Sequence, residues 1–245
     1  MSQSKSVDIA RDAQRVFNVL RNGGLAIIPA NVGYGLVACD AEALDRLFTV
    51  KRRKPHKKHA MIGSYVLQES IHALPPERQA MVRLLTVDLD LPLGVVAPFR
   101  ADHHLVRRLG DTTLSKSTIN DTLSMLVNGG NLQEELSRLT TAAGLPLMGS
   151  SANISGTGTK LVVEEIEPEV QAAADLVIDY GRQRYGHPRA SSTMIDFASM
   201  RVVRFGACYD VICDVFQRFY KIQLPEDPGP AILSSGHLLP EARLY

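Results

Sequence analysis

The chain has 245 residues, of which 45% are hydrophobic, and its 27 Lys and Arg against 26 Asp and Glu give a net charge of +1. This composition supports a globular protein with a buried core and excludes a strongly charged surface, so nucleic-acid binding would need a local basic patch. The three cysteines form no CxxC pair, and no apolar leader or run of about 18 apolar residues occurs. We therefore expect no disulfide framework, no metal site and no membrane partner, and a cytoplasmic location.

Helices and strands are expected to alternate in the first half of the chain. Apolar residues recur at helical spacing from Ser6 to Leu20, and Asn22-Gly23-Gly24 ends that pattern. Asp40 is placed to cap a helix that begins after it. The other elements expected in this half are strands at 25–29, 33–39, 60–65 and 93–99, and helices at 69–74 and 76–85.

The second half begins with a gap, because residues 100–121 are polar and show no clear period. Beyond it we expect strands at 123–127, 145–148, 176–179, 192–197 and 201–204, and helices at 132–143 and 164–173. An amphipathic segment then runs to Tyr220, and a tail rich in Pro, Gly and Ser begins at Pro225. The chain is predicted to form one mixed α/β domain over residues 1–207, followed by a C-terminal extension over 208–245.

The first candidate motif lies at the expected turn between two strands, from Pro29 to Leu36. Its glycines, Gly33 and Gly35, would let the backbone approach a ligand closely. An ordinary strand-turn-strand unit with glycines needed for packing explains the same residues, and both interpretations stay open.

The second motif is the segment Lys51 to His59, in which six of the first eight residues are Lys or Arg. Pro55 makes a continued helix unfavourable, so the segment is predicted to be a loop. Exposed positive charges packed together repel each other by about 1 kcal/mol per close pair in water. An anion such as a triphosphate or an RNA backbone is therefore a natural partner, and a solvated surface loop is the alternative.

Two further motifs lie at the ends of expected strands. Gly149 to Gly156 follows the apolar run at 145–148 and offers hydroxyl and amide donors to phosphate oxygens. It lacks the lysine of a P-loop, and an ordinary polar turn would use the same residue types. In the last motif, hydroxyl groups begin the segment Ser191 to Asp196, and Arg204 ends the strand after it.

Taken together, the order and spacing of the four motifs resemble the YrdC/Sua5 family, which includes YciO and whose best-known members are threonylcarbamoyl-AMP synthases. The resemblance covers roughly Val7 to Ala207. The matching residues are Pro29, Tyr34, Gly35 and Leu36, then Lys51-Arg52-Arg53, Ser151 to Gly156, Ser192 to Asp196, and Arg204 to Ala207.

The resemblance implies a fold, a reaction and a set of site residues. The fold is a twisted open mixed sheet with helices around a large basic cavity. The reaction joins ATP, with Mg²⁺, to bicarbonate and L-threonine, and it releases pyrophosphate and an acyl adenylate for modification of tRNA. The implied residues are Lys51 and Arg53 for catalysis; Lys51, Arg53, Ser151, Asn153, Ser192 and Arg204 for the nucleotide; and Asn31, Tyr34, Ser150 and Thr193 for the substrate.

The chain departs from the family pattern on the side that would face the amino acid. Ala30 and Val32 stand where two threonines are usual, Asn31 replaces an acidic residue between them, and Leu126 falls where an arginine is expected. Loss of such polar groups changes substrate selectivity. Three interpretations stay open: a threonylcarbamoyl-AMP synthase, a paralogue that uses another acceptor, and a non-catalytic module that binds double-stranded RNA or a nucleotide.

Overall fold

The computed structural model describes residues 7–53, 57–187 and 190–229. Lys54, Pro55 and His56 of the basic loop and the end of the predicted extension lie outside these residues. The helices are α1 (Ile9–Arg21), α2 (Ala41–Val50), α3 (Tyr65–Ile71), α4 (Pro76–Arg83), α5 (His104–Ser115), α6 (Asn131–Ala142), α7 (Pro168–Ala172) and α8 (Tyr209–Val215), with π-helical turns η1 (Leu84–Asp88) and η3 (Phe216–Tyr220) and the 3₁₀ turn η2 (Val163–Glu165). The strands are β1 (Ala26–Ala30), β2 (Gly33–Ala38), β3 (Ala60–Gly63), β4 (Leu93–Pro98), β5 (Thr118–Ile119), β6 (Thr122–Val127), β7 (Met148–Ser151), β8 (Leu176–Val177), β9 (Met194–Asp196) and β10 (Arg201–Arg204).

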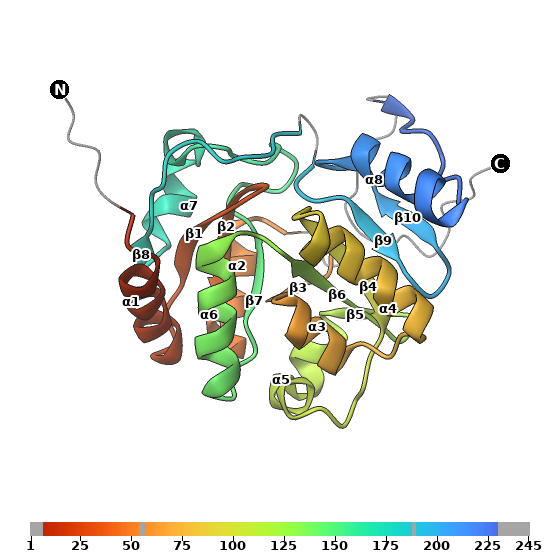
Figure 1. Ribbon diagram of the computed structural model, residues 1–245. Coiled ribbons are helices and arrows are strands. Elements are labelled where there is room, and N and C mark those ends of the chain that lie inside the picture. Colours follow the sequence, from red (N-terminus) through yellow and green to blue (C-terminus); the bar gives the residue numbers. More distant parts are fainter. Residues whose placement is uncertain (1–6, 54–56, 188–189, 230–245) are drawn as a thin grey trace.

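The strands of the described residues form one mixed sheet that twists through the centre of the molecule (Figure 1). Its order is β10-β9-β4-β6-β3-β7-β2-β1-β8, and β5 pairs with β6. Most neighbours are antiparallel, whereas β1 with β8, β3 with β6, and β4 with β9 are parallel. Segments far apart in the sequence are therefore neighbours in the sheet, which brings the predicted motifs together.

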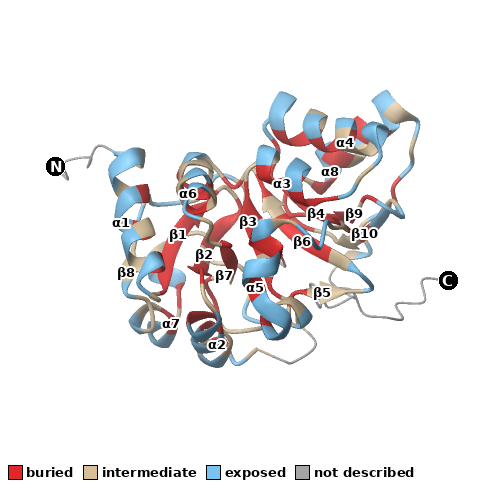
Figure 2. Cartoon of the chain, turned by 90° about the horizontal axis from the view of Figure 1, so that it is seen from below, coloured by how far each residue is buried: buried red, intermediate tan, exposed pale blue. Residues whose placement is uncertain are grey.

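Apolar side chains cover both faces of the sheet, so its central strands are buried (Figure 2). Consecutive strand residues point to opposite faces. Ile27, Leu36 and Met61 belong to the larger core cluster, which also contains residues of α2 to α5, α7 and α8. Their neighbours Ile28, Val37 and Ile62 belong to a smaller cluster with α1 and α6. The sheet thus separates two layers, and the second layer also borders the cavity described below.

Polar caps begin several helices where the sequence places them. Asp40 Oδ1 accepts a hydrogen bond from Ala43 N at 2.9 Å, which confirms the predicted cap of α2. Asp8 caps α1 in the same way through Arg11 N. Ser64 caps α3 through Leu67 N, and α3 consequently begins several residues earlier than predicted.

Other elements differ from the prediction in position. The segment without a clear period contains α5, in which Gly110 adopts φ 67° and interrupts the helical spacing. The strand predicted at 145–148 is instead β7, which begins at Met148 and continues through Gly149 and two serines. The helix predicted at 164–173 is divided into η2 and α7, because Pro168 starts a new helix.

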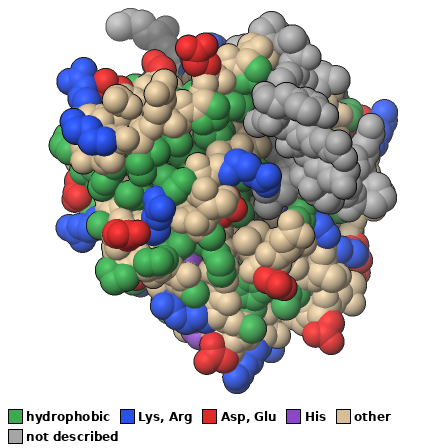
Figure 3. All heavy atoms as spheres, turned by 90° about the vertical axis from the view of Figure 1, so that its right-hand side faces the viewer, with side chains coloured by type: hydrophobic (Ala, Val, Ile, Leu, Met, Phe, Trp, Pro, Cys, Tyr) green, Lys and Arg blue, Asp and Glu red, His purple; other side chains and the backbone are tan. Residues whose placement is uncertain are grey.

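The surface shows no extended field of one charge in the view of Figure 3. On the side of α8 and β10, Lys and Arg side chains are interspersed with Asp and Glu and with apolar side chains in the coloured part of that view. Within the described residues, no helix is both long and apolar enough to cross a membrane.

Candidate nucleotide-binding site

A cavity of about 450 Å³ lies on the α1 and α6 side of the sheet, where these helices leave the strands uncovered. Its size suits a ligand such as a nucleotide. Apolar side chains from five strands form what we call the apolar floor, which consists of Ile28, Val37, Ile62, Leu126 and Met194. The floor of the cavity is therefore built on the sheet, and loop residues complete the lining.

Glycines on β2, β4 and β7 leave room above the floor. A Cβ on Gly149 would lie 3.0 Å from Val37 Cγ1 and 3.1 Å from Ile62 Cγ1. A Cβ on Gly94 would lie 2.4 Å from Met194 Cγ, whereas one on Gly35 would meet only Ser150 O, at 3.6 Å. The open volume thus depends on residues that carry no side chain.

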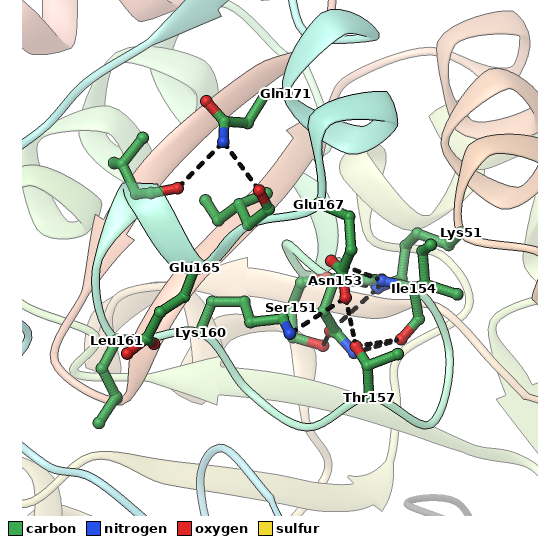
Figure 4. Close-up of polar contacts among 12 residues, drawn as sticks. Lys51, Ser151, Asn153, Ile154, Thr157, Lys160, Leu161, Glu165, Glu167 and Gln171 are labelled. Carbon is green, nitrogen blue, oxygen red and sulfur yellow. Dashed lines mark hydrogen bonds and ion pairs between the residues drawn. The ribbon is translucent and has the colours of Figure 1, made fainter.

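Lys51, at the end of α2, holds the loop that follows β7 (Figure 4). Its Nζ donates to the carbonyl oxygens of Ser151 and Asn153, the latter at 2.6 Å, and to Asn153 Oδ1 at 3.3 Å. The side chain is only 1% exposed. Burial, together with the positive charges of Arg53 and Lys57, lowers the pKa of Lys51 well below its usual value. The three acceptors match the three N–H groups of an ammonium group.

Glu167 also holds this loop in place. This carboxylate accepts from Thr157 Oγ1 at 2.6 Å and from Ile154 N at 3.2 Å, and it lies 3.0 Å from Lys160 Nζ. Partial burial would raise the pKa of Glu167, but the hydrogen bonds that it accepts, from Thr157 first, outweigh that effect and lower the pKa to about 2. Lys51 and Glu167 therefore both hold residues 151–157 in place (Figure 4).

Two arginines, Arg53 in the loop after α2 and Arg204 at the end of β10, line the cavity. Arg53 Nη1 donates to Ser150 Oγ at 2.5 Å, and its guanidinium lies 5.3 Å from the centre of the Phe48 ring. Arg204 donates to Ser192 O at 2.8 Å and to the hydroxyls of Ser191 and Ser192, each at 3.0 Å.

Both arginines stay cationic at neutral pH despite their burial. Burial, and then the nearby Arg204, lowers the pKa of Arg53 to about 10, and burial lowers the pKa of Arg204 to about 10. Two half-buried like charges repel each other, and an anion that lies between them offsets this repulsion. Of the described residues that line the cavity, those with charged side chains are all basic: Lys51, Arg53, Lys57 and Arg204.

The described lining residues do not form a protein site for Mg²⁺. They include no carboxylate, which is the usual protein ligand of this ion, and no group of three potential metal-binding side chains is found among the described residues. We therefore assign no step of the chemistry to a protein-bound metal.

The structure brings most of the predicted site residues into one cavity. Its lining includes Lys51, Arg53, Ser150, Ser151, Asn153, Ser192, Arg204 and Tyr34. The Tyr34 hydroxyl, however, is hydrogen-bonded at 2.8 Å to both Asp179 Oδ1 and Gly181 O, and burial raises the pKa of Tyr34 to about 12. This hydroxyl braces the segment that follows β8.

Asn31 and Thr193 are not among the residues that line the cavity. The Asn31 N–H donates to Gly129 O at 2.6 Å, and its carbonyl accepts from Tyr185 N at 2.7 Å, so it ties two loops together. The Thr193 hydroxyl donates to Ala207 O at 3.0 Å and accepts from Gly206 N at 3.2 Å. Both residues stabilise backbone next to the site.

Sequence reasoning did not single out several lining residues, including Ser124, Gln133 and most of the apolar floor. Gln133 Nε2 donates to Gly63 O at 3.1 Å and to Leu126 O at 3.0 Å, and Gln133 Oε1 is buried without a hydrogen-bond partner among the described residues. The alternation of residues along each strand does contain a signal for the floor. That signal does not distinguish a cavity wall from a packed core.

Comparison with known proteins supports the resemblance. The family model named for Sua5, YciO and YrdC, described as telomere recombination, matches residues 18–206. The structure of P. abyssi Sua5 complexed with L-threonine superposes with a TM-score of 0.70 at 20% identity, over 90% of this chain and 61% of that chain. This chain therefore spans about three fifths of the Sua5 chain.

Two other solved structures are similar in fold. A hypothetical protein from Streptococcus mutans UA159 gives a TM-score of 0.70 at 22% identity, over 86% of this chain and 93% of that one. Full-length HypF, in a phosphate- and nucleotide-bound form, gives 0.58 at 21% identity, over 84% of this chain and 30% of that one. These similarities confirm the predicted mixed α/β fold. With the family model matching most of its length, the chain belongs to the Sua5/YciO/YrdC family.

Proposed function

We propose that the protein binds ATP in the cavity and forms an acyl adenylate from a carbamate, as a threonylcarbamoyl-AMP synthase does. The observation that carries this proposal is the pair of half-buried guanidinium groups, Arg53 and Arg204, in a cavity whose described charged lining is entirely basic. Such a lining stabilises a polyphosphate and the charge that develops when pyrophosphate leaves.

The chemistry needs positioning and positive charge more than a protein nucleophile. The amine of an amino acid condenses with bicarbonate to give a carbamate and water. A carbamate oxygen then attacks the α-phosphorus of ATP, and the bond to the β-phosphate oxygen breaks to release pyrophosphate. Arg53 and Arg204 would hold the phosphates, while Lys51 keeps the loop of Ser151 and Asn153 in place to hydrogen-bond the nucleotide. Mg²⁺ is expected to arrive bound to the triphosphate.

The relatives support the class of ligand. P. abyssi Sua5 was solved with L-threonine, and HypF was solved with phosphate and a nucleotide. On this basis we also propose that ATP, bicarbonate and an amino acid are the substrates, and that the adenylate serves modification of tRNA. The relatives thus support the proposed reaction class, and the residues that line the cavity support the proposed phosphate contacts.

The proposal is tested by Arg53→Met and Arg204→Met, with ATP binding measured by calorimetry and pyrophosphate release measured with bicarbonate and amino acids. Each substitution should weaken ATP binding at least tenfold, because a charge-assisted phosphate contact is worth about 1.5–3 kcal/mol. Arg52→Met and Arg201→Met are matched controls on the same two segments, since both side chains are exposed. They should bind ATP like the wild type.

Unchanged ATP affinity in both cavity variants would contradict the phosphate role. If the wild type binds ATP but releases no pyrophosphate with any amino acid, and binds RNA in a salt-dependent way, the chain acts instead as a non-catalytic binding module.

A further inference from the structure

The apolar floor is continuous across the sheet. In the strand register, Ile62 pairs with Leu126, Leu126 with Gly94, and Gly94 with Met194. Adjacent strands lie about 4.8 Å apart, so this row spans roughly 14 Å. Ile28 and Val37 extend the same face on β1 and β2. The cavity therefore presents a broad surface on which a hydrocarbon group can be buried.

Ala30 and Val32 add to the apolar character at the edge of this floor. Both line the cavity, and both are almost fully buried. They lie at the turn between β1 and β2, while Leu126 is on β6. All three positions at which the chain departs from the family pattern towards an apolar residue thus face the same cavity.

Polar groups next to the floor are largely committed to the backbone. Both N–H groups of the Gln133 amide donate to the carbonyls of Gly63 and Leu126. Gln133 Oε1 has no hydrogen-bond partner among the described residues, and it lies beside Gly129, which does not line the cavity. Ser124 shares the face of Leu126 but lies two residues along β6, about 6.7 Å away. A hydroxyl buried directly on the floor would lose its hydrogen bonds to water, whereas a methyl group in its place would gain apolar contacts.

The other wall of the cavity has the opposite character. Arg53 and Lys57, together with Ser150, line it with positive charge and a hydroxyl, so the phosphates and a second anion would share these cations. A carboxylate is attracted to such a wall. The cavity thus fits a molecule that has an anionic end and a branched apolar end, in addition to the phosphates of a nucleotide.

We propose that the acceptor substrate is an L-amino acid with a branched aliphatic side chain, such as valine, isoleucine or leucine, which packs on the apolar floor. This inference rests on the proposed function, because it names the amine that the adenylate-forming reaction uses. Valine has the shape of threonine with a methyl group in place of the hydroxyl, so the two amino acids provide the sharpest comparison. Apolar pockets discriminate by about 10- to 200-fold for changes of this size.

The test is calorimetric titration of L-valine, L-isoleucine, L-leucine, L-threonine and L-serine into the full chain, with and without a non-hydrolysable ATP analogue. The best aliphatic amino acid should bind about 10- to 100-fold more tightly than threonine. Ile62→Thr and Leu126→Thr should each reduce that preference about tenfold. Val66→Thr, at a side chain that is 73% exposed on α3, is the control and should leave the preference unchanged.

The outcomes separate this inference from the proposed function. Threonine as the tightest ligand, or no binding of any aliphatic amino acid, overturns the inference even when the ATP analogue binds. A preference for aliphatic amino acids in the absence of nucleotide supports it even when the analogue does not bind. The order of amino-acid affinities measured for the wild type is enough to support or overturn the inference. The inference therefore stays testable even if a variant fails to fold.

Discussion

The hydrogen bonds of Lys51 point to a structural contribution beside the phosphate contact that the family resemblance implies. The resemblance places Lys51 and Arg53 together on the phosphates, but the Lys51 ammonium group is directed to the backbone of the loop after β7. Arg53, two residues later, also lines the cavity, and its guanidinium group donates to Ser150 Oγ and to the carbonyl oxygens of Lys57 and Lys58. Lys51 therefore holds the loop after β7 in place, while Arg53 and Arg204 contribute positive charge to the cavity lining.

Lys51→Met is expected to destabilise the protein. It removes one donor from Ser151 O, Asn153 O and Asn153 Oδ1. Ser151 O still accepts from Asn153 N, and Asn153 Oδ1 still accepts from Ser151 Oγ. Among the described residues Asn153 O is then left as an unpaired buried acceptor, which costs about 1–3 kcal/mol. The midpoint of urea unfolding should fall accordingly, and ATP affinity should fall with it because the loop is released. Lys57→Met, which also removes a positive charge from the cavity lining, is the matched control. Equal stability of the two variants would argue against a structural role for Lys51.

At the scale of elements, the central strands and the capped helices are predictable because their residues repeat with a clear period. The run Leu25 to Pro29 and the alternation in β6 contain enough apolar residues to be recognised. β7 is different, because Gly149, Ser150 and Ser151 have the composition of a turn. They form a strand because β2 and β3 supply hydrogen-bond partners on both sides.

The charged residues of the site could be predicted from the sequence, whereas the apolar floor could not. Lys51, Arg53 and Arg204 carry charge, so their clustering in motifs is visible in the sequence. Ile62 and Met194 are apolar residues in strands, and nothing local distinguishes an apolar cavity wall from an apolar core. Only the register of the sheet places them on the open part of the α1 and α6 side.

Two glycines of the cavity are expected to respond differently to the same change. In Gly149→Ala, the new methyl group would press on Val37, Ile62 and Leu36 O at 3.0–3.1 Å, so we expect a loss of stability of about 1 kcal/mol or more. In Gly35→Ala it would make an ordinary contact at 3.6 Å, so stability should change little. Thermal unfolding of both variants measures the difference. A larger loss for Gly35→Ala would mean that the strand register differs from the one described.

At the scale of the whole molecule, two buried histidines couple global stability to pH. His59 is 0% exposed, and neither ring nitrogen has a hydrogen-bond partner among the described residues. Burial, and then the charges of Arg53 and Lys116, lower the pKa of His59 to about 3. Burial lowers the pKa of His72 to about 4, against a hydrogen bond to Leu123 O that raises it.

Because both folded-state pKa values lie below the ordinary value of about 6.5, the unfolded chain binds protons that the folded chain does not. Stability should therefore fall as pH decreases from about 6.5 towards 3–4, by about 1.4 kcal/mol per pH unit for each histidine. The centre of the His59 ring lies 3.9 Å from the centre of the Phe48 ring. His59→Phe should therefore keep an aromatic contact there and remove the contribution of His59 to this pH dependence. Urea unfolding at pH 7 and pH 5 measures the slope, and His104→Phe at an exposed position is the control. An unchanged slope in His59→Phe would place the acid sensitivity elsewhere.

The register of the sheet also determines when the site exists during folding. Its walls come from β1 near the start of the chain and from Arg204 on β10, and β9 joins the sheet only by pairing with β4 across about a hundred residues of sequence. Pairings between such distant segments carry a large loop-closure entropy and form slowly. A chain still emerging from the ribosome has most of the sheet but lacks one wall of the cavity until β10 is made. The cavity is thus complete only after β10 has joined the sheet, and any ligand that binds it would stabilise the folded domain without favouring its partly synthesised precursors.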